Sequence, residues 1–213
     1  MNYNQRGLQT TNPQQWYTKN RVNLPGVTEV IWEPLYHRQA IAAGGGTTSL
    51  TFFQAQAGVG SVTEADTNMD LQGQLPSGKS FLVTGIQIAF YTDQNAEGAT
   101  AAASGIVTDA VNFYKNGVVK LKIGSKNYLT QAPFGKFPPV ERMAVVSDNT
   151  GGEVAANVTE LKYAMAAGRE FSITDLLLEN GQNFGVELSG IASLTFASKI
   201  MVTLNGYLGR NAQ

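Results

Sequence analysis

From residue 41 onward the chain is a succession of short apolar runs separated by turns rich in glycine, proline and asparagine. The clearest run is 81–91, where Leu82, Ile86, Ile88 and Phe90 recur on one face. Side chains of a strand alternate between its two faces, so this spacing predicts a β-strand. Further strands are predicted over 47–57, 106–115, 118–123, 143–147, 171–178, 184–188 and 194–208.

These runs amount to about eight to ten strands, and they do not alternate with helices as βαβ units do. The pattern therefore favours antiparallel sheets. Eight strands of six to eight residues, with their loops, occupy roughly 170 residues, which is close to the length of 41–213. The sequence predicts an all-β fold, an antiparallel β-sandwich built as a single jelly roll over 41–213. Two jelly rolls in tandem require more strands than this length supplies.

Two segments carry local predictions. Asn116-Gly117 lies between the predicted strands 106–115 and 118–123, and it predicts a type I′ hairpin, whose central residues both adopt positive φ. Residues 154–165 are compatible with a helix, whose first turn would hold a capping box of Thr150 and Glu153. The alternation of Thr159, Leu161, Tyr163 and Met165 fits a strand equally well. Both alternatives stay open, and an extended segment is favoured.

Residues 1–40 differ from the rest of the chain. Nine of the first 23 residues are Asn or Gln, and such a segment buries too little apolar surface to fold alone. We expect an extended N-terminal interaction arm over 1–40, ordered by a neighbouring subunit with Trp16 and Tyr17 as anchors. A floppy terminus is the alternative.

Composition excludes several classes of function. The formal net charge is −1, which gives no overall basic field to hold nucleic acid. Cysteine is absent, which removes disulfides, thiolate metal sites and thiol catalysis. The single histidine is His37; without a nucleophile elbow nearby, we expect it to be a structural or an exposed histidine. No run reaches the roughly 18 apolar residues of a membrane helix, and no secretory signal is expected.

Residues 73–80 match the nucleotide-binding pattern G-x-x-x-x-G-K-[ST]. In such a loop Lys79 would pair the phosphates and Ser80 would hold magnesium. The context is wrong, because a polar stretch precedes the match and an alternating strand follows it, where a phosphate site needs a helix N-terminus. The pattern is therefore interpreted as a turn that enters a strand.

The acidic residues suggest no metal or catalytic site. Asp66, Asn68 and Asp70 have the spacing of the first ligands of a calcium loop, but Leu71 replaces the turn glycine and Ser77 the bidentate glutamate. A solvated loop is expected, with no metal and no cofactor. Scattered acids are interpreted as strand-end or solvent-face charges: Asp109, Glu160, Asp175 and Glu187.

Lysines gather around the predicted hairpin of residues 115–126: Lys115, Lys120, Lys122, Lys126 and Lys136. Lys120 and Lys122 share one strand face, and Val119, Leu121 and Ile123 share the other. We expect a solvent-facing side protected against edge pairing. The alternative is a patch for an acidic partner or nucleic acid, facing inward or outward in an assembly.

Three stretches resemble strand and loop segments of β-sandwich capsid proteins of tailless icosahedral bacteriophages: 116–133, 176–188 and 202–210. The resemblance implies a virion structural protein with a single jelly roll, as a major shell, minor or vertex protein. It supplies no catalytic motif.

The sequence therefore predicts a capsid subunit without enzymatic activity. We expect it to self-assemble as a homo-oligomer through its sandwich and arm, to contact copies of itself and other virion proteins, and to reside in virions assembled in the host cytoplasm. Low charge and many small residues suit a surface covered by sister copies.

Two rival functions remain. A carbohydrate-binding sandwich would use exposed aromatic residues such as Trp16, Trp32 or Tyr91. An enzyme would be a glycosidase, or a nucleotide hydrolase that uses Lys79.

Overall fold

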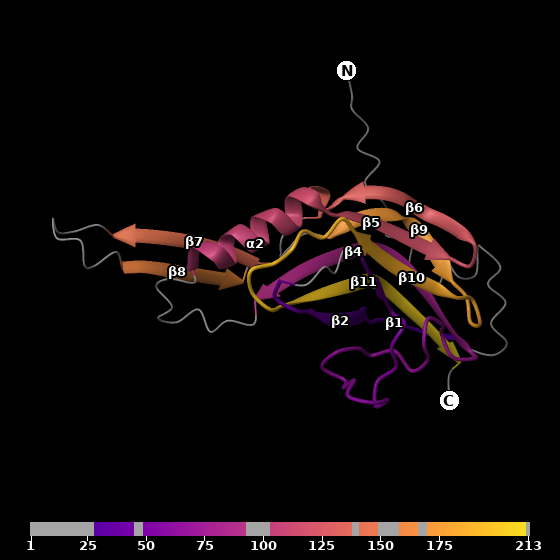
Figure 1. The fold of residues 1–213 in the computed structure, drawn as a ribbon. Helices are drawn as coiled ribbons and strands as arrows, with labels where there is room; N and C mark the ends of the chain where they lie inside the picture. The colour runs from indigo at the N-terminus through magenta and orange to yellow at the C-terminus, as the bar shows by residue number, and fades with distance from the viewer. Residues whose placement is uncertain are drawn as a thin grey trace, which may run out of the picture.

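The computed structural model describes residues 28–44, 49–92, 103–137, 141–148, 158–165 and 170–211. Two antiparallel sheets pack against each other, and a helix lies beside them (Figure 1). The predicted all-β sandwich is confirmed.

The larger sheet has the strand order β1-β11-β4-β9, with β2 also paired to β11. Its members are β1 (Thr28–Trp32), β2 (Leu35–Ile41), β4 (Lys79–Thr92), β9 (Phe171–Leu178) and β11 (Ser198–Asn211). β1 and β2 follow one another along the same edge of β11, opposite 207–211 and 198–204 respectively. The sheet therefore begins at Thr28, ahead of the boundary predicted at residue 41.

The smaller sheet has the order β3-β10-β5-β6. It comprises β3 (Ser49–Phe52), β10 (Phe184–Ser189), β5 (Val118–Ile123) and β6 (Lys126–Pro133). Eight strands form the sandwich proper: β2, β3, β4, β5, β6, β9, β10 and β11. The first of them pairs with the last, the second with the last but one, and so on inward, which gives the pairs β2–β11, β3–β10, β4–β9 and β5–β6. This nested pairing of eight strands over two sheets is the winding of a single jelly roll.

The core lies between the two sheets. Ile86, Ile88 and Phe90 of β4 are buried in it, as the alternation predicted. Leu82 is buried but is not part of this core cluster, which contains Phe81 and Val83 instead, because the register of β4 shifts between Val83 and Gly85. From the opposite sheet, Leu121 of β5 and Val186 of β10 join the same cluster. Burial of these apolar faces against each other is the main stabilising term of such a sandwich.

The strand predicted over 106–115 and the hairpin at Asn116-Gly117 are wrong. Residues Ala103–Asn116 form the helix α2, and β5 begins directly after Gly117. Phe113 of α2 stacks on Phe90 at a centroid distance of 4.9 Å and lies 4.5 Å from Phe134. Packing against the sandwich therefore overrides the β-branched composition of this segment. In the described residues, no helix has the length and apolar character to cross a bilayer.

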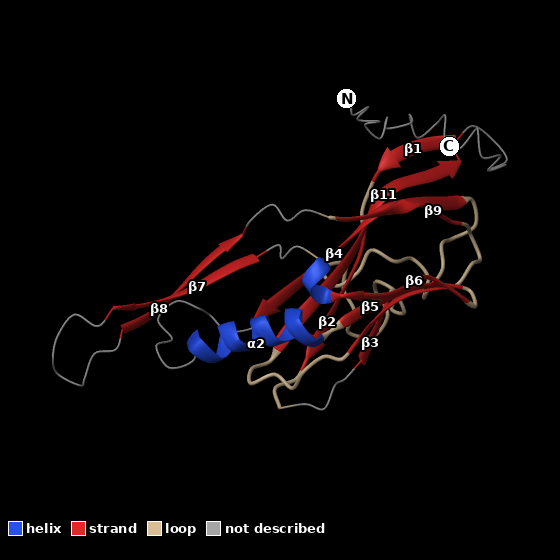
Figure 2. Ribbon diagram, turned by 90° about the horizontal axis from the view of Figure 1, so that it is seen from above, coloured by secondary structure: helices blue, strands red, loops and turns tan. Residues whose placement is uncertain are grey.

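A hairpin of β7 (Glu141–Asp148) and β8 (Val158–Met165) is inserted between β6 and β9 and belongs to neither sheet of the roll. Both views show it extending away from the sandwich, beside α2 (Figures 1 and 2). The extended alternative for 154–165 is confirmed over 158–165. Thr150 and Glu153, the capping-box residues of the other alternative, lie outside the described residues.

Residues 1–27, which include the predicted anchors Trp16 and Tyr17, lie outside the described residues. For them the N-terminal arm stays a prediction. Thr28–Trp32 and Leu35–Ile41 are strands of the larger sheet. A short 3₁₀ helix, η1 (Phe134–Lys136), follows β6 and supplies the buried Phe134.

Candidate functional site

The segment that matches the nucleotide-binding pattern is a turn leading into β4. Gly73 and Gly78 have positive φ values of 65° and 78°, and β4 begins at Lys79. The ammonium of Lys79 lies 2.6 Å from a carboxylate oxygen of Asp70. Because a strand follows the turn, no helix N-terminus is present to bind phosphate. The predicted turn entering a strand is confirmed.

Ser80, the second residue of β4, is buried with 1% of its surface exposed. Its hydroxyl has no hydrogen-bond partner among the residues that the structure describes. In a nucleotide-binding loop this hydroxyl would face magnesium, whereas here it lies in the wall of the sandwich.

The three residues with calcium-loop spacing bind three different partners. Asp66 pairs with Arg38 at 3.0 Å, and Asp70 pairs with Lys79. Asn68 accepts a hydrogen bond from the backbone N–H of Tyr36 at 3.0 Å. Among the described residues, no three His, Asp or Glu side chains are grouped as metal ligands. The loop 53–78 is thus fastened to β2 by Asp66 and Asn68, and to the start of β4 by Asp70.

His37 is buried on β2, with 3% of its surface exposed. Its Nδ1 accepts a hydrogen bond of 2.6 Å from the backbone N–H of Phe53. Phe53 has a φ of 69°, a left-handed conformation that is strained for an aromatic residue. The imidazole therefore holds a strained turn at the end of β3, in agreement with the structural role expected for it.

Burial lowers the pKa of His37 from 6.5 to about 4, against a smaller opposing effect of the Asp66 carboxylate. The histidine is thus neutral at physiological pH. A neutral imidazole whose Nδ1 accepts from the backbone has its proton on Nε2.

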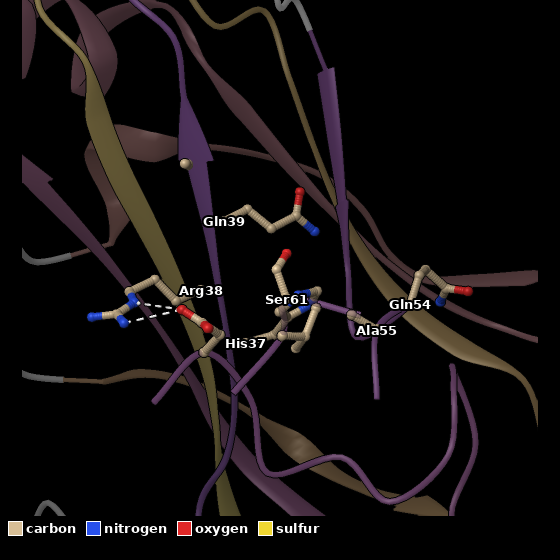
Figure 3. A pocket seen from close by; sticks show the side chains of 9 residues that line it. His37, Arg38, Gln39, Gln54, Ala55 and Ser61 are labelled. Carbon is tan, nitrogen blue, oxygen red and sulfur yellow. Dashed lines mark hydrogen bonds and ion pairs between the residues drawn. The ribbon is translucent and has the colours of Figure 1, made fainter. Parts of the chain in front are cut away.

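A hollow of about 450 Å³ lies over this part of the molecule (Figure 3). Its walls come from β2 and from the loop after β3, and they include His37, Arg38, Gln39, Gln54, Ser61 and Asp66. The Asp66 carboxylate accepts hydrogen bonds from the backbone and hydroxyl of Thr63 and from Arg38, which together lower its pKa to about 2.

The amide groups of this hollow are bonded to the scaffold. Gln39 donates to the carbonyl of Thr51 at 2.7 Å, and Gln54 donates to the carbonyl of Phe184 at 2.9 Å. The main polar groups of the hollow thus form ion pairs or hydrogen bonds with each other and with the backbone. Sequence reasoning missed this hollow, because it depends on contacts between residues about 30 positions apart.

The lysine-bearing face of β5 is solvent-facing, as predicted. Its predicted role in protection against edge pairing is wrong, because β5 lies between β10 and β6 inside its sheet. The turn predicted before it is also wrong. Val119, Leu121 and Ile123 are buried, and Lys120 and Lys122 lie on the other face. Both lysines pair with Glu187 of β10, Lys120 at 3.6 Å. The hydrogen bond from Lys122 lowers the pKa of Glu187. One carboxylate shared by two ammonium groups reduces the positive charge of this patch.

Asp109, interpreted from sequence as a strand-end or solvent-face charge, is buried on α2 with 2% exposed. Its carboxylate accepts hydrogen bonds of 2.9 Å from the backbone N–H groups of Thr195 and Phe196. That interpretation is wrong for Asp109, because the loop before β11 folds over the helix. The side chains of Glu160 and Asp175 lie outside the description.

Large apolar side chains are exposed at separate places on the described surface. Trp32 ends β1 and is 63% exposed, and Tyr128 on β6 is 52% exposed. They belong to different sheets, and Tyr91 of β4 is only partly exposed. The described aromatic residues therefore do not form a single platform.

No family model matches this sequence, and no curated protein matches it. Among solved structures, the decameric BFDV capsid protein shares 10% sequence identity, with 86% of this chain and 100% of that chain covered and a TM-score of 0.16. A likeness of this degree carries no argument here, so the fold assignment depends on the strand pairing alone.

Proposed function

We propose that this protein is a capsid subunit that self-assembles into a shell. The observation that carries the proposal is the nested pairing of its eight strands, which is the jelly roll used by many viral shell proteins. A fold alone does not define a function, so the proposal also needs support from the surface of the molecule.

The surface supports a role in assembly. Within the described residues, the core is one cluster of buried apolar side chains, and the main polar groups of the hollow beside His37 are bonded to one another or to the backbone. The hairpin β7–β8 lies outside both sheets, and a two-stranded hairpin is marginally stable in water on its own. These features suit a subunit whose remaining contacts come from neighbouring subunits.

The sequence resemblance to capsid proteins of tailless icosahedral bacteriophages supports the finer proposal. In it the protein is a phage virion component without enzymatic activity, assembled in the host cytoplasm with copies of itself and other virion proteins.

A carbohydrate-binding sandwich is the second candidate, favoured by the exposed Trp32 beside the end of β1. An aromatic ring of this exposure can stack on a sugar. In that case Trp32→Ala would abolish binding to a glycan array and leave the oligomeric state unchanged.

Negative-stain electron microscopy of the purified full chain tests the proposal. We expect closed particles of uniform diameter. A homogeneous monomer at high protein concentration would contradict the proposal, and glycan binding by that monomer would favour the second candidate. If the purified protein shows any nucleotide hydrolysis, Lys79→Ala is expected to retain all of it.

A further inference from the structure

The hollow beside His37 contains a buried hydrogen-bond donor that no described residue satisfies. His37 has 3% of its surface exposed, and its neutral ring carries the proton on Nε2, because Nδ1 accepts from the backbone of Phe53. The Nε2–H group donates to no residue in the described part of the chain. Among the described side chains, the one fully enclosed polar atom without a partner belongs to Ser80, so Nε2 is accessible, and the ring lines the hollow. Buried polar groups are normally hydrogen-bonded, so the acceptor for this donor has to come from a molecule bound in the hollow.

Two glutamine side chains give the hollow acceptors that are held in place. The amide N–H of Gln39 is bonded to the carbonyl of Thr51, and that of Gln54 to the carbonyl of Phe184. Both amide oxygens remain available, since no described residue donates to them. The hydroxyl of the exposed Ser61, which lines the same hollow, both donates and accepts. Glutamine side chains already fixed by the backbone bind a ligand with little further loss of conformational freedom.

The charges of the hollow are balanced, which determines the kind of ligand. Arg38 and Asp66 pair with each other at 3.0 Å, and His37 is neutral. A charged ligand would break this pair or leave its own charge uncompensated. Hydroxyl groups donate and accept without charge, and they therefore suit the site. Small apolar side chains form another part of the wall: Ala40, Ala55 and Val62.

The hollow has the size of a small-molecule site, and a second hollow adjoins it at Gln54. The first has a volume of about 450 Å³, within the roughly 300–1,000 Å³ of such sites. Gln54 also lines the second, of about 230 Å³, where the charged groups of Lys122 and Glu187 are again paired. In Figure 3 the Arg38–Asp66 pair lies at one side of the view and Gln54 at the other. A linear ligand that passes Gln54 would therefore contact both hollows.

We propose that the hollow beside His37 binds a neutral oligosaccharide, with one sugar hydroxyl accepting from Nε2 of His37 and others bonded to Gln39 and Ser61. A saccharide combines hydroxyl groups with C–H faces that pack on small apolar side chains. The proposal goes beyond the proposed function and does not depend on it. It also differs from the second candidate, because Trp32 does not line either hollow.

A glycan array probed with the fluorescently labelled full chain tests the proposal. The array carries neutral oligosaccharides together with sialylated and sulfated ones. We expect the protein to bind neutral members, and Ser61→Trp, whose indole fills the hollow, to lose this binding. The absence of binding to any neutral member, or binding to anionic members alone, would overturn the proposal.

Ser77→Trp is the matched control, because Ser77 is an exposed serine of the same loop 53–78 and lines neither hollow. We expect it to bind as the wild-type protein does, and both variants to unfold at the wild-type temperature. Equal binding by the two variants would overturn the proposal. Binding that survives Ser61→Trp and is lost in Trp32→Ala would assign the glycan to the second candidate instead.

His37 offers a second readout that requires no variant, since it is the single histidine of the chain. In protein labelled with ¹⁵N-histidine, the neutral oligosaccharide with the strongest array signal is expected to shift the Nε2 resonance, while Nδ1 stays unprotonated. An Nε2 resonance that is unchanged at saturating oligosaccharide would overturn the proposal.

These outcomes separate the saccharide site from the proposed function. Particles that form but bind no neutral glycan would remove the site and leave the capsid function standing. A protein that binds neutral glycans through this hollow and never forms particles would do the reverse.

Discussion

The hydrogen bond from the Phe53 backbone to His37 links a titratable group to a strained turn. Phe53 keeps its left-handed φ of 69° while the buried imidazole accepts its N–H at 2.6 Å. Protonation of Nδ1 would replace this acceptor by a donor and leave the N–H without a partner. The stability of the turn is therefore coupled to the charge of one side chain.

The protein is expected to lose stability between about pH 6.5 and pH 4. The pKa of His37 is about 4 when folded and 6.5 as the ordinary value, so the unfolded chain binds the proton first as pH falls and the free energy of unfolding decreases. The full difference corresponds to about 3 kcal/mol. Urea unfolding at a series of pH values measures it.

His37→Asn is the control for this pH dependence, because its amide oxygen can accept from Phe53 without titrating. We expect its unfolding free energy to change much less over that pH range, where the lowered pKa of Glu187 affects both proteins alike. The pKa of Asp66 is lowered to about 2, so its own contribution is lost only at lower pH. If the unfolding free energy of the wild-type protein followed the same pH dependence as that of His37→Asn, the coupling of stability to His37 protonation would be contradicted.

Asp109 fastens the loop before β11 to α2 through bonds to the N–H groups of Thr195 and Phe196. Asp109→Asn keeps the shape but replaces one accepting oxygen by a donor that faces N–H groups. Charged hydrogen bonds of this kind contribute roughly 1.5–3 kcal/mol, and we expect a loss of that size in thermal or urea unfolding. Glu179→Gln, at an exposed loop position, is the control and should be neutral.

At the scale of elements, the junction of α2 and β5 depends on a small residue. A Cβ at Gly117 would lie 1.9 Å from Cε2 of Phe134, and Phe134 is fully buried. Gly117→Ala should therefore cost about 3 kcal/mol, at the upper end for overpacking.

Gly135→Ala offers a comparison within the same region. Its Cβ would meet only the Tyr114 carbonyl at 3.7 Å, an ordinary contact. Unfolding experiments on both variants should show a large loss for Gly117→Ala and little change for Gly135→Ala. Equal effects would contradict the packing described for this junction.

The strands were predictable because apolar residues at a two-residue spacing, such as Ile86, Ile88 and Phe90, are a signal that is local in the sequence. The helix α2 was missed because residues 106–115 are rich in β-branched residues, and only contacts of Phe113 with Phe90 and Phe134 select the helix. The roles of His37 and Asp109 could not be predicted either. Both depend on backbone N–H groups brought from 16 and 86 residues away.

At the scale of the whole molecule, four strand pairs join the first part of the chain to the last part: β2–β11, β3–β10, β4–β9 and β5–β6. Each sheet still has edge strands, and the hairpin β7–β8 stands apart from both sheets. A subunit that leaves such edges unpaired has contacts to offer to other copies.

Sedimentation velocity of the purified full chain over a hundredfold concentration range tests this account most directly. The account predicts a cooperative change from subunits or small oligomers to a single, much faster boundary of assembled shells. One slow boundary at the sedimentation rate of a monomer, unchanged at every concentration, would contradict it.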